Sequence, residues 1–77
     1  MKDLLEYLAR GLVEEPDEVH VNEVQEDDAT ILELSVGEDD YGNVIGRGGR
    51  TAAALRAIVK SGGTKRGRRV FLDIVDD

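Results

Sequence analysis

The stretch that decides the fold, residues 40–50, reads DYGNVIGRGGR. Three of residues 46–49 are glycines, which do not continue a helix comfortably and therefore predict a tight turn. The apolar pair before the turn would close a short helix, whose N-terminus the carboxylates at 38–40 are suited to cap. Residues 50–60 predict a stronger helix, because three alanines are followed by apolar residues on one face (Leu55, Ile58 and Val59).

A glycine-rich turn between two helices has a physical use when it carries arginines. Glycines let the backbone approach a sugar-phosphate chain closely, and the N–H groups and dipole at the start of the next helix favour a negative partner. Arg47 and Arg50 add positive charge there. The alternative is a helix C-cap followed by a helix N-terminus, for which one glycine normally suffices. Three glycines in four positions favour contact with a phosphate backbone.

Upstream of this stretch, the sequence predicts one helix and a β-hairpin. Apolar residues recur at helical spacing from Asp3, a suitable N-cap, until Pro16 ends the helix (Leu4, Leu5, Leu8, Leu12 and Val13). Residues 19–24 carry three valines and predict a short strand. After a polar turn at 25–28, residues 29–36 alternate between apolar and polar, as a half-buried strand does. We expect the two strands to pair.

Downstream, the sequence predicts a loop and a last strand. Residues 61–69 are glycine-rich and basic, hence a loop, and residues 70–75 place Val70, Leu72 and Ile74 on one face of a strand. The expected order is helix, strand, strand, helix, helix, strand, an α+β arrangement. No repeat or linker divides the chain, so we expect a single domain over residues 1–77.

The charge of the chain is unevenly distributed. The net charge is -7, but residues 1–40 hold two basic and fourteen acidic side chains, whereas residues 41–77 hold eight basic and three acidic ones. A polyanion would therefore meet the second half, and the acidic half would limit non-specific binding. The alternative is an ordinary acidic protein with one basic face. The basic loop at 65–69 is likewise open to two interpretations, a backbone-tracking loop or a solvated one.

Composition excludes several kinds of site. There is no cysteine, and the single histidine, His20, does not make a zinc site alone. No serine or threonine has an evident base nearby, and both glycine-rich segments fail the spacing rules for Walker and dinucleotide-binding loops. Three aromatics are too few and too dispersed for a stacking platform (Tyr7, Tyr41 and Phe71). No apolar run approaches the roughly 20 residues of a membrane span. We expect a cytoplasmic, non-enzymatic protein without a metal, a cofactor, a membrane contact or a small-molecule substrate.

Residues 40–50 resemble the core of a KH domain, whose hallmark is Ile-Gly-x-x-Gly between two helices. The whole chain is similar to the small bacterial single-KH proteins of the KhpA family. This resemblance implies a type II KH domain, with a three-stranded sheet covered on one face by three helices. It also implies a non-enzymatic RNA-binding protein of the kind described as RNA chaperones, with links to cell-envelope growth and cell shape. Such proteins self-associate and pair with a second, larger KH-containing protein.

Carried over by position, the resemblance implies that Gly46, Arg47, Gly48 and Gly49 contact single-stranded RNA, with Ile45 packed beneath them and Arg50 opening the next helix. Gly48 departs from the family, where Lys, Arg or Gln is usual. We expect bases to lie in an apolar groove between that helix and a neighbouring strand. The complete predicted RNA site is Ile45, Gly46, Arg47, Gly48, Gly49, Arg50, Arg56, Lys65, Arg66, Arg68 and Arg69. The competing hypothesis is a KH-fold interaction or dimerisation module that binds RNA weakly.

Overall fold

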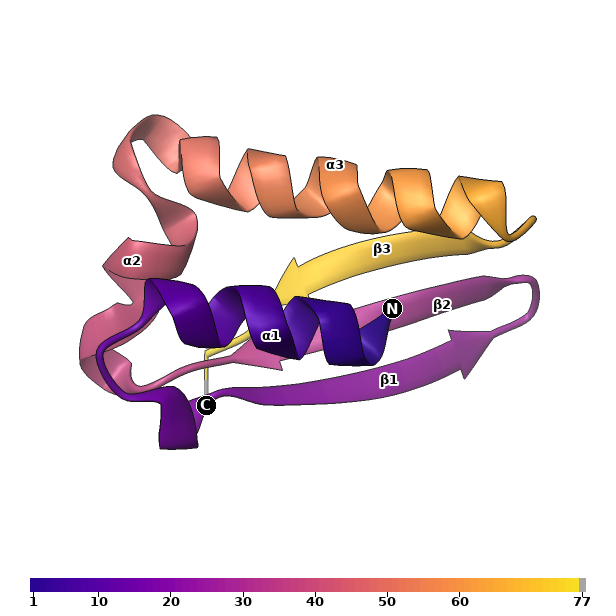
Figure 1. The fold of residues 1–77 in the computed structure, drawn as a ribbon. Helices are drawn as coiled ribbons and strands as arrows, with labels where there is room; N and C mark the ends of the chain where they lie inside the picture. The colour runs from indigo at the N-terminus through magenta and orange to yellow at the C-terminus, as the bar shows by residue number, and fades with distance from the viewer. Residues whose placement is uncertain (77) are drawn as a thin grey trace.

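A computed structural model describes residues 1–76 and shows three strands in one mixed sheet beside three α-helices (Figure 1). The last residue of the predicted domain, 77, lies outside the described residues. Along the chain the elements are α1 (Lys2–Leu12), β1 (His20–Glu26), β2 (Ala29–Ser35), α2 (Tyr41–Ile45), α3 (Arg50–Lys65) and β3 (Arg69–Ile74). Short 3-10 turns occupy Pro16–Glu18, Glu38–Asp40 and Arg47–Gly49. The predicted α-β-β-α-α-β order is confirmed.

The central strand of the sheet, β2, pairs with a neighbour on each side. It runs antiparallel to β1, which confirms the hairpin, and parallel to β3. Two parallel strands need a crossover connection between them. Helices α2 and α3 form this connection on the helix-covered side of the sheet (Figure 1). The crossover brings the end of β3 back beside α2, so two parts of the chain that are distant in sequence become neighbours.

One face of the sheet carries the core. Alternate residues of β2 and β3 are buried beneath the helices, and the intervening residues are half-buried or exposed, except Ser35 at the end of β2, which is buried. The helices contribute Leu5 and Ala9 from α1, and Val44 and Val59 from α2 and α3, all of them fully buried. The strands supply Leu32, Leu34, Val70 and Leu72. The expected arrangement, helices on one face and an open face opposite, follows from this alternation.

Helix α3 is longer than the sequence predicts. The predicted loop at 61–69 is wrong in its first five residues, which continue the helix to Lys65 despite two glycines. A Cβ atom on Gly63 would lie 2.5 Å from a methyl group of Val70 and 3.0 Å from the Arg68 carbonyl oxygen. Glycine is therefore used here for close packing of α3 against β3, and that contact offsets its low helix propensity.

The first helix also differs at both ends from the prediction. Its N-cap is Met1, and Asp3 lies within the first turn. The helix ends at Leu12, and Pro16 instead begins a 3-10 turn. The early end has a structural reason, because Val13 is extended and directs the next two backbone N–H groups toward Asp40. Within residues 1–76, no helix is long and apolar enough to cross a membrane.

Candidate nucleic-acid interface

The glycine loop, residues 46–49, connects α2 to α3 through backbone conformations that favour glycine. Gly46, Gly48 and Gly49 have φ angles of 77°, 65° and 76°. At Gly46 there is no room for a side chain, because a Cβ atom would lie 2.7 Å from Cβ and 2.9 Å from the backbone nitrogen of Thr51. The loop therefore closes tightly onto the first turn of α3 at Gly46.

The outer side of the glycine loop is open. A Cβ atom on Gly48 or Gly49 would meet no described atom within 4 Å, and the flanking Arg47 and Arg50 are exposed. Gly49 is the N-cap of α3, and no side chain of residues 1–76 caps this helix by a hydrogen bond. The preceding 3-10 turn uses the N–H groups of Gly49 and Arg50, which donate to the carbonyls of Gly46 and Arg47. The N–H groups that follow in the first turn of this 16-residue helix have no side-chain cap, and they face the partner that the helix dipole favours, an anion.

A groove begins where the glycine loop meets α3. This cavity of about 420 Å³ is lined by Tyr41, Ile45, Gly49, Ala52, Arg56, Ile74 and Asp76. These residues come from α2, the loop, α3 and the end of β3, so the groove lies between the helix after the loop and a neighbouring strand, as predicted. Its floor is mostly apolar, and Arg56 supplies a cation on its α3 side.

The prediction that Ile45 packs beneath the glycine loop is wrong. Ile45 is 40% exposed and lines the groove, whereas its neighbour Val44 is fully buried in the core. In a helix of five residues, adjacent side chains point about 100° apart, so only one of the pair faces the sheet. The exposed isoleucine is available to contact a ligand.

Two side chains, Asp40 and Tyr41, hold α2 in place and thereby fix one wall of the groove. The Asp40 carboxylate accepts hydrogen bonds from the backbone N–H groups of Glu14 (3.0 Å) and Glu15 (3.1 Å) and from the Asn43 amide (2.8 Å). The Glu14 N–H bond, followed by the Asn43 bond, lowers the pKa of this carboxyl below its usual value, although burial opposes the shift. The Tyr41 hydroxyl donates to the Val75 carbonyl at 2.6 Å.

These contacts correct the expected role of the carboxylates at 38–40. Asp40 is the N-cap of α2 by position, but its side chain makes no capping bond to a backbone N–H group of that helix, although it accepts from the Asn43 side chain. It is 2% exposed and binds the segment after α1 instead. The carboxylate therefore joins two distant parts of the chain.

The predicted RNA-binding residues fall into two groups at opposite ends of α3. The glycine loop and Arg50 lie at its start, with Arg56 in the groove. Four other cations, here called the far cluster, lie at its end: Lys65, Arg66, Arg68 and Arg69. At 1.5 Å per residue, the ends of α3 are about 22 Å apart. The structure therefore does not bring the far cluster to the glycine loop (Figure 1).

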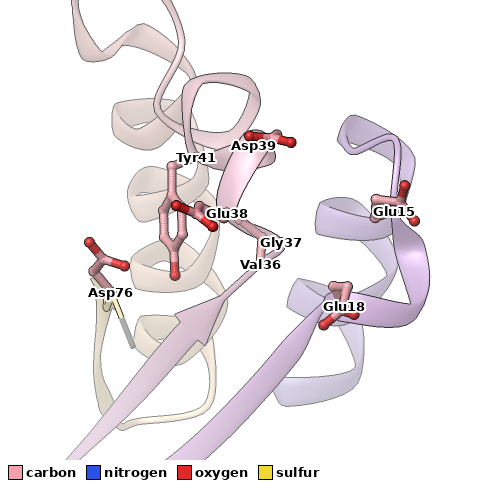
Figure 2. Close-up of a pocket in the computed structure, with 8 residues that line it drawn as sticks. All are labelled: Glu15, Glu18, Val36, Gly37, Glu38, Asp39, Tyr41 and Asp76. Carbon is pink, nitrogen blue, oxygen red and sulfur yellow. The ribbon is translucent and has the colours of Figure 1, made fainter.

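An acidic basin lies against the other side of Tyr41. This cavity of about 830 Å³ is lined by Glu15, Glu18, Val36, Gly37, Glu38, Asp39, Tyr41 and Asp76 (Figure 2). Tyr41 and Asp76 line the groove as well, so the two cavities share a wall. No cluster of His, Cys, Asp or Glu within residues 1–76 has the arrangement to hold a metal ion. The basin instead presents negative charge beside the groove, which a phosphate chain would avoid.

Sequence reasoning missed four groove residues: Tyr41, Ala52, Ile74 and Asp76. Ile74 was expected on the inward face of the last strand, but only the parallel pairing of β2 and β3 brings it opposite α2. The available signal for Ala52 was a small residue in the first turn of α3, because it lets a ligand approach the helix closely. For Asp76 the sequence carried no signal.

Comparison with known proteins finds a matching family profile and several relatives. The profile described as "KhpA/KhpB, KH domain" matches residues 2–74. The RNA-binding protein KhpA of Halalkalibacterium halodurans is 51% identical over 76 residues, covering 99% of this chain and 100% of the relative. The proteins of the same name from Clostridium perfringens and Chlamydia caviae are 45% and 42% identical, over 97% and 100% of this chain and 100% and 99% of theirs. No solved structure matches the chain.

These matches decide two predictions made from the sequence. The type II KH arrangement agrees with the matched family and is confirmed. The expectation of a non-enzymatic protein is confirmed by the same assignment. Since the family profile covers nearly the whole chain and the relatives align over their full lengths, this chain belongs to the KhpA/KhpB family of KH-domain proteins.

Proposed function

We propose that this chain is a cytoplasmic RNA-binding protein, a single KH domain that binds a short segment of single-stranded RNA through its glycine loop. The matched relatives are named as RNA-binding proteins, which supports RNA as the partner. The protein acts as an RNA chaperone or post-transcriptional regulator, and the resemblance to its family connects that role with cell shape.

One observation carries the proposal: an open glycine loop, at the start of a helix that no described side chain caps, lies directly beside an apolar groove. Backbone N–H groups and exposed arginines bind phosphates, whereas apolar walls accept the faces of bases. Arg47 and Arg50 flank the loop, and Ile45 and Ile74 line the groove. The site thus offers one surface to each part of a nucleotide: the loop to the phosphates and the groove beside it to the bases.

The test is a double charge reversal in the loop. Arg47→Asp with Gly48→Asp should abolish binding of single-stranded RNA, because two carboxylates would face the phosphates. Both side chains point into open space, and Asp tolerates a positive φ better than most residues. Circular dichroism and the unfolding midpoint should therefore change little.

A matched control places the same charges elsewhere. Lys2→Asp with Gly11→Asp makes the same formal charge change on α1, where a Cβ atom on Gly11 would also meet no described atom within 4 Å. This control should bind RNA like the parent. Equal RNA binding by the parent and the loop variant would reject the loop as the site.

The second candidate function is a protein-interaction module, and a specific observation favours it. Leu4 and Tyr7 on α1 and Ile58 on α3 are exposed, although a chain of 77 residues has few apolar side chains to leave in water. We propose a homodimer or a complex with a second, larger KH-containing protein. Light scattering across a concentration series tests the homodimer, and a monomer at every concentration would reject it.

A further inference from the structure

A third cavity lies at the opposite end of α3 from the glycine loop. It measures about 230 Å³ and is lined by Lys60, Thr64, Arg68, Arg69, Val70 and Phe71. Half of these residues are cations, and no carboxylate of the described chain is among them. The charge of this cavity is therefore complementary to a polyanion.

Phe71 is the aromatic residue of this cavity, and the core does not account for it. It lies on β3, an edge strand, with its side chain on the face of the sheet opposite the helices, where it is 48% exposed. The register places it opposite Ile31, which adds apolar surface beside the ring. The Arg69 guanidinium lies 5.5 Å from the ring centroid. A ring with an apolar neighbour and a stacked cation matches the surface on which proteins stack bases.

The cations around Phe71 differ in how firmly they are held. The Arg68 guanidinium donates to the side-chain oxygens of Gln25 (2.6 Å) and Thr30 (2.9 Å), so its position is fixed before any ligand arrives. Arg69 and Asp28 approach only to 3.8 Å, and both side chains are largely exposed, so this pair is weak. Lys60 is exposed on α3. Thr30 is buried on the helix side of the sheet, whereas Phe71 lies on the other face, so the guanidinium of Arg68 is held away from the ring. Arg69 lies on the same face as Phe71 and is suited to bind a phosphate beside it.

This cavity and the groove lie along the same seam between α3 and β3. The groove is lined by Arg56 from α3 and Ile74 from β3, and the third cavity is lined by Lys60 and Phe71 from the same two elements. Arg56 and Lys60 are one helical turn, about 6 Å, apart on one face of α3. In the other direction the groove meets the acidic basin. An RNA strand that leaves the groove is thus attracted along α3 and repelled from the basin.

We propose that the far end of the α3/β3 seam is a second nucleotide subsite, where a base stacks on Phe71 and the flanking phosphates bind Lys60 and Arg69. The subsite rests on the proposed RNA-binding function and extends it. It makes RNA that reaches beyond the nucleotides held by the glycine loop the preferred ligand, and it is selective for single strands because duplex bases are already stacked.

Direct contact is testable because the chain contains no tryptophan. Phe71→Trp places one reporter at the subsite and keeps an aromatic ring. Single-stranded RNA of about ten nucleotides should quench its emission, whereas RNA of about four nucleotides, the length that a KH loop holds, should leave the emission unchanged. As a control, Tyr7→Trp places the reporter on exposed α1 and should respond to neither RNA. Equal emission of the Phe71→Trp protein with and without the longer RNA would overturn the subsite.

Affinity gives the second readout. Phe71→Leu should weaken binding of the longer RNA by about fivefold to twentyfold, the lower part of the range for one stacked base because leucine keeps an apolar surface, and should not change binding of the shorter RNA. Lys60→Gln should weaken only the longer complex, whereas the exposed Tyr7→Leu and Lys2→Gln controls should weaken neither. Loss of both complexes in Phe71→Leu would indicate damage to the fold and reject the subsite.

The remaining outcomes separate the subsite from the proposed function. If the shorter RNA binds and depends on the glycine loop while Phe71→Leu has no effect, the subsite is wrong and the function stands. If the parent binds neither RNA, both are wrong. If Phe71→Leu changes the mass in light scattering but not RNA affinity, the open face is a protein interface, and the subsite is rejected.

Discussion

The groove and the acidic basin share the wall formed by Tyr41 and Asp76, yet they have opposite character. The groove has an apolar floor, an arginine on one side and an open glycine loop at its end. The basin is lined by five carboxylates and has no basic residue among its described lining residues. An acidic protein can therefore bind a polyanion, provided that the charges are segregated by its fold. The position of the basin also implies a direction for bound RNA, because the basin repels a strand on one side of the groove only.

The largest loss of RNA affinity is expected when a carboxylate is placed inside the groove. Ile45→Asp should weaken binding of single-stranded RNA by about 100-fold, because an apolar contact is replaced by an unpaired negative charge that faces the phosphates. Ile45 is 40% exposed, so the fold should tolerate the change. Fluorescence anisotropy with a labelled oligonucleotide measures the affinity.

Ile58 provides a matched control for that variant. It is 42% exposed, lies on α3 and is outside the groove, so Ile58→Asp adds the same charge to a similar environment. This variant should keep nearly the affinity of the parent. An equal loss in both variants would mean that overall charge, and not the groove, determines binding.

Salt distinguishes the two kinds of contact in the site, because it weakens phosphate contacts and leaves apolar contacts in place. If three or four phosphates are neutralised between Arg47 and Arg69, the plot of log affinity against log salt should have a slope of about -2 to -3. Raising salt from about 50 to 200 mM should then lower the affinity roughly 15- to 60-fold. Binding should persist weakly at high salt, and the same sequence annealed as a duplex should bind less well.

A much steeper slope with equal affinity for duplex and single strand would contradict the groove. Such a result would indicate non-specific attraction to the basic residues of α3 and β3. Phe71→Leu, which removes no charge, should leave the slope unchanged and serves as the control.

Neutralising the basin should have a smaller effect of opposite sign. Glu38→Gln with Asp39→Asn removes two carboxylates beside the groove without touching its lining. RNA affinity should rise by about threefold at low salt, and the gain should disappear as salt screens the charges. Neutralising Glu23 and Glu26 on β1, which are exposed and outside both cavities, should change the affinity less. Equal gains from both pairs would show that the basin has no local role.

Local patterns in the sequence predicted the elements and the glycine loop well. The alternation at 29–36 and the glycines at 46–49 are statements about neighbouring residues, and the backbone follows them. The groove was expected from the resemblance to KH domains, and the structure has it between α3 and β3.

Features that depend on distant contacts were not predictable in the same way. The extension of α3 depends on Gly63 meeting Val70, and the exposure of Ile45 depends on which side of a short helix faces the sheet. The far cluster was grouped with the glycine loop because sequence gives no distance along a helix until its end is known. The basin combines residues from positions 15 to 76, which only the fold brings together.

Asp40 tests whether the two cavities depend on one shared support. Its carboxylate holds the segment that carries Glu15, a basin residue, against α2, which carries Ile45, a groove residue. The two backbone N–H groups bind different oxygens of the carboxylate, and an asparagine replaces one of these oxygens by an NH₂ donor, so one of the two bonds is lost. Asp40→Asn should therefore lower the free energy of unfolding, with a small effect, about twofold, on RNA affinity.

The pH dependence identifies the carboxylate as the cause. The pKa of Asp40 is lower in the folded protein than in the unfolded chain, where it is about 3.9, so its stabilisation is complete well above that value and is lost as the pH falls through the folded pKa. The difference in stability between parent and Asp40→Asn should thus be largest above about pH 5 and shrink in more acidic solution. Urea unfolding across a pH series measures it, with the exposed Asp39→Asn as the control that should show no such difference. A parent–variant difference that stays constant down to low pH would mean that packing, and not the charge, joins the two cavities.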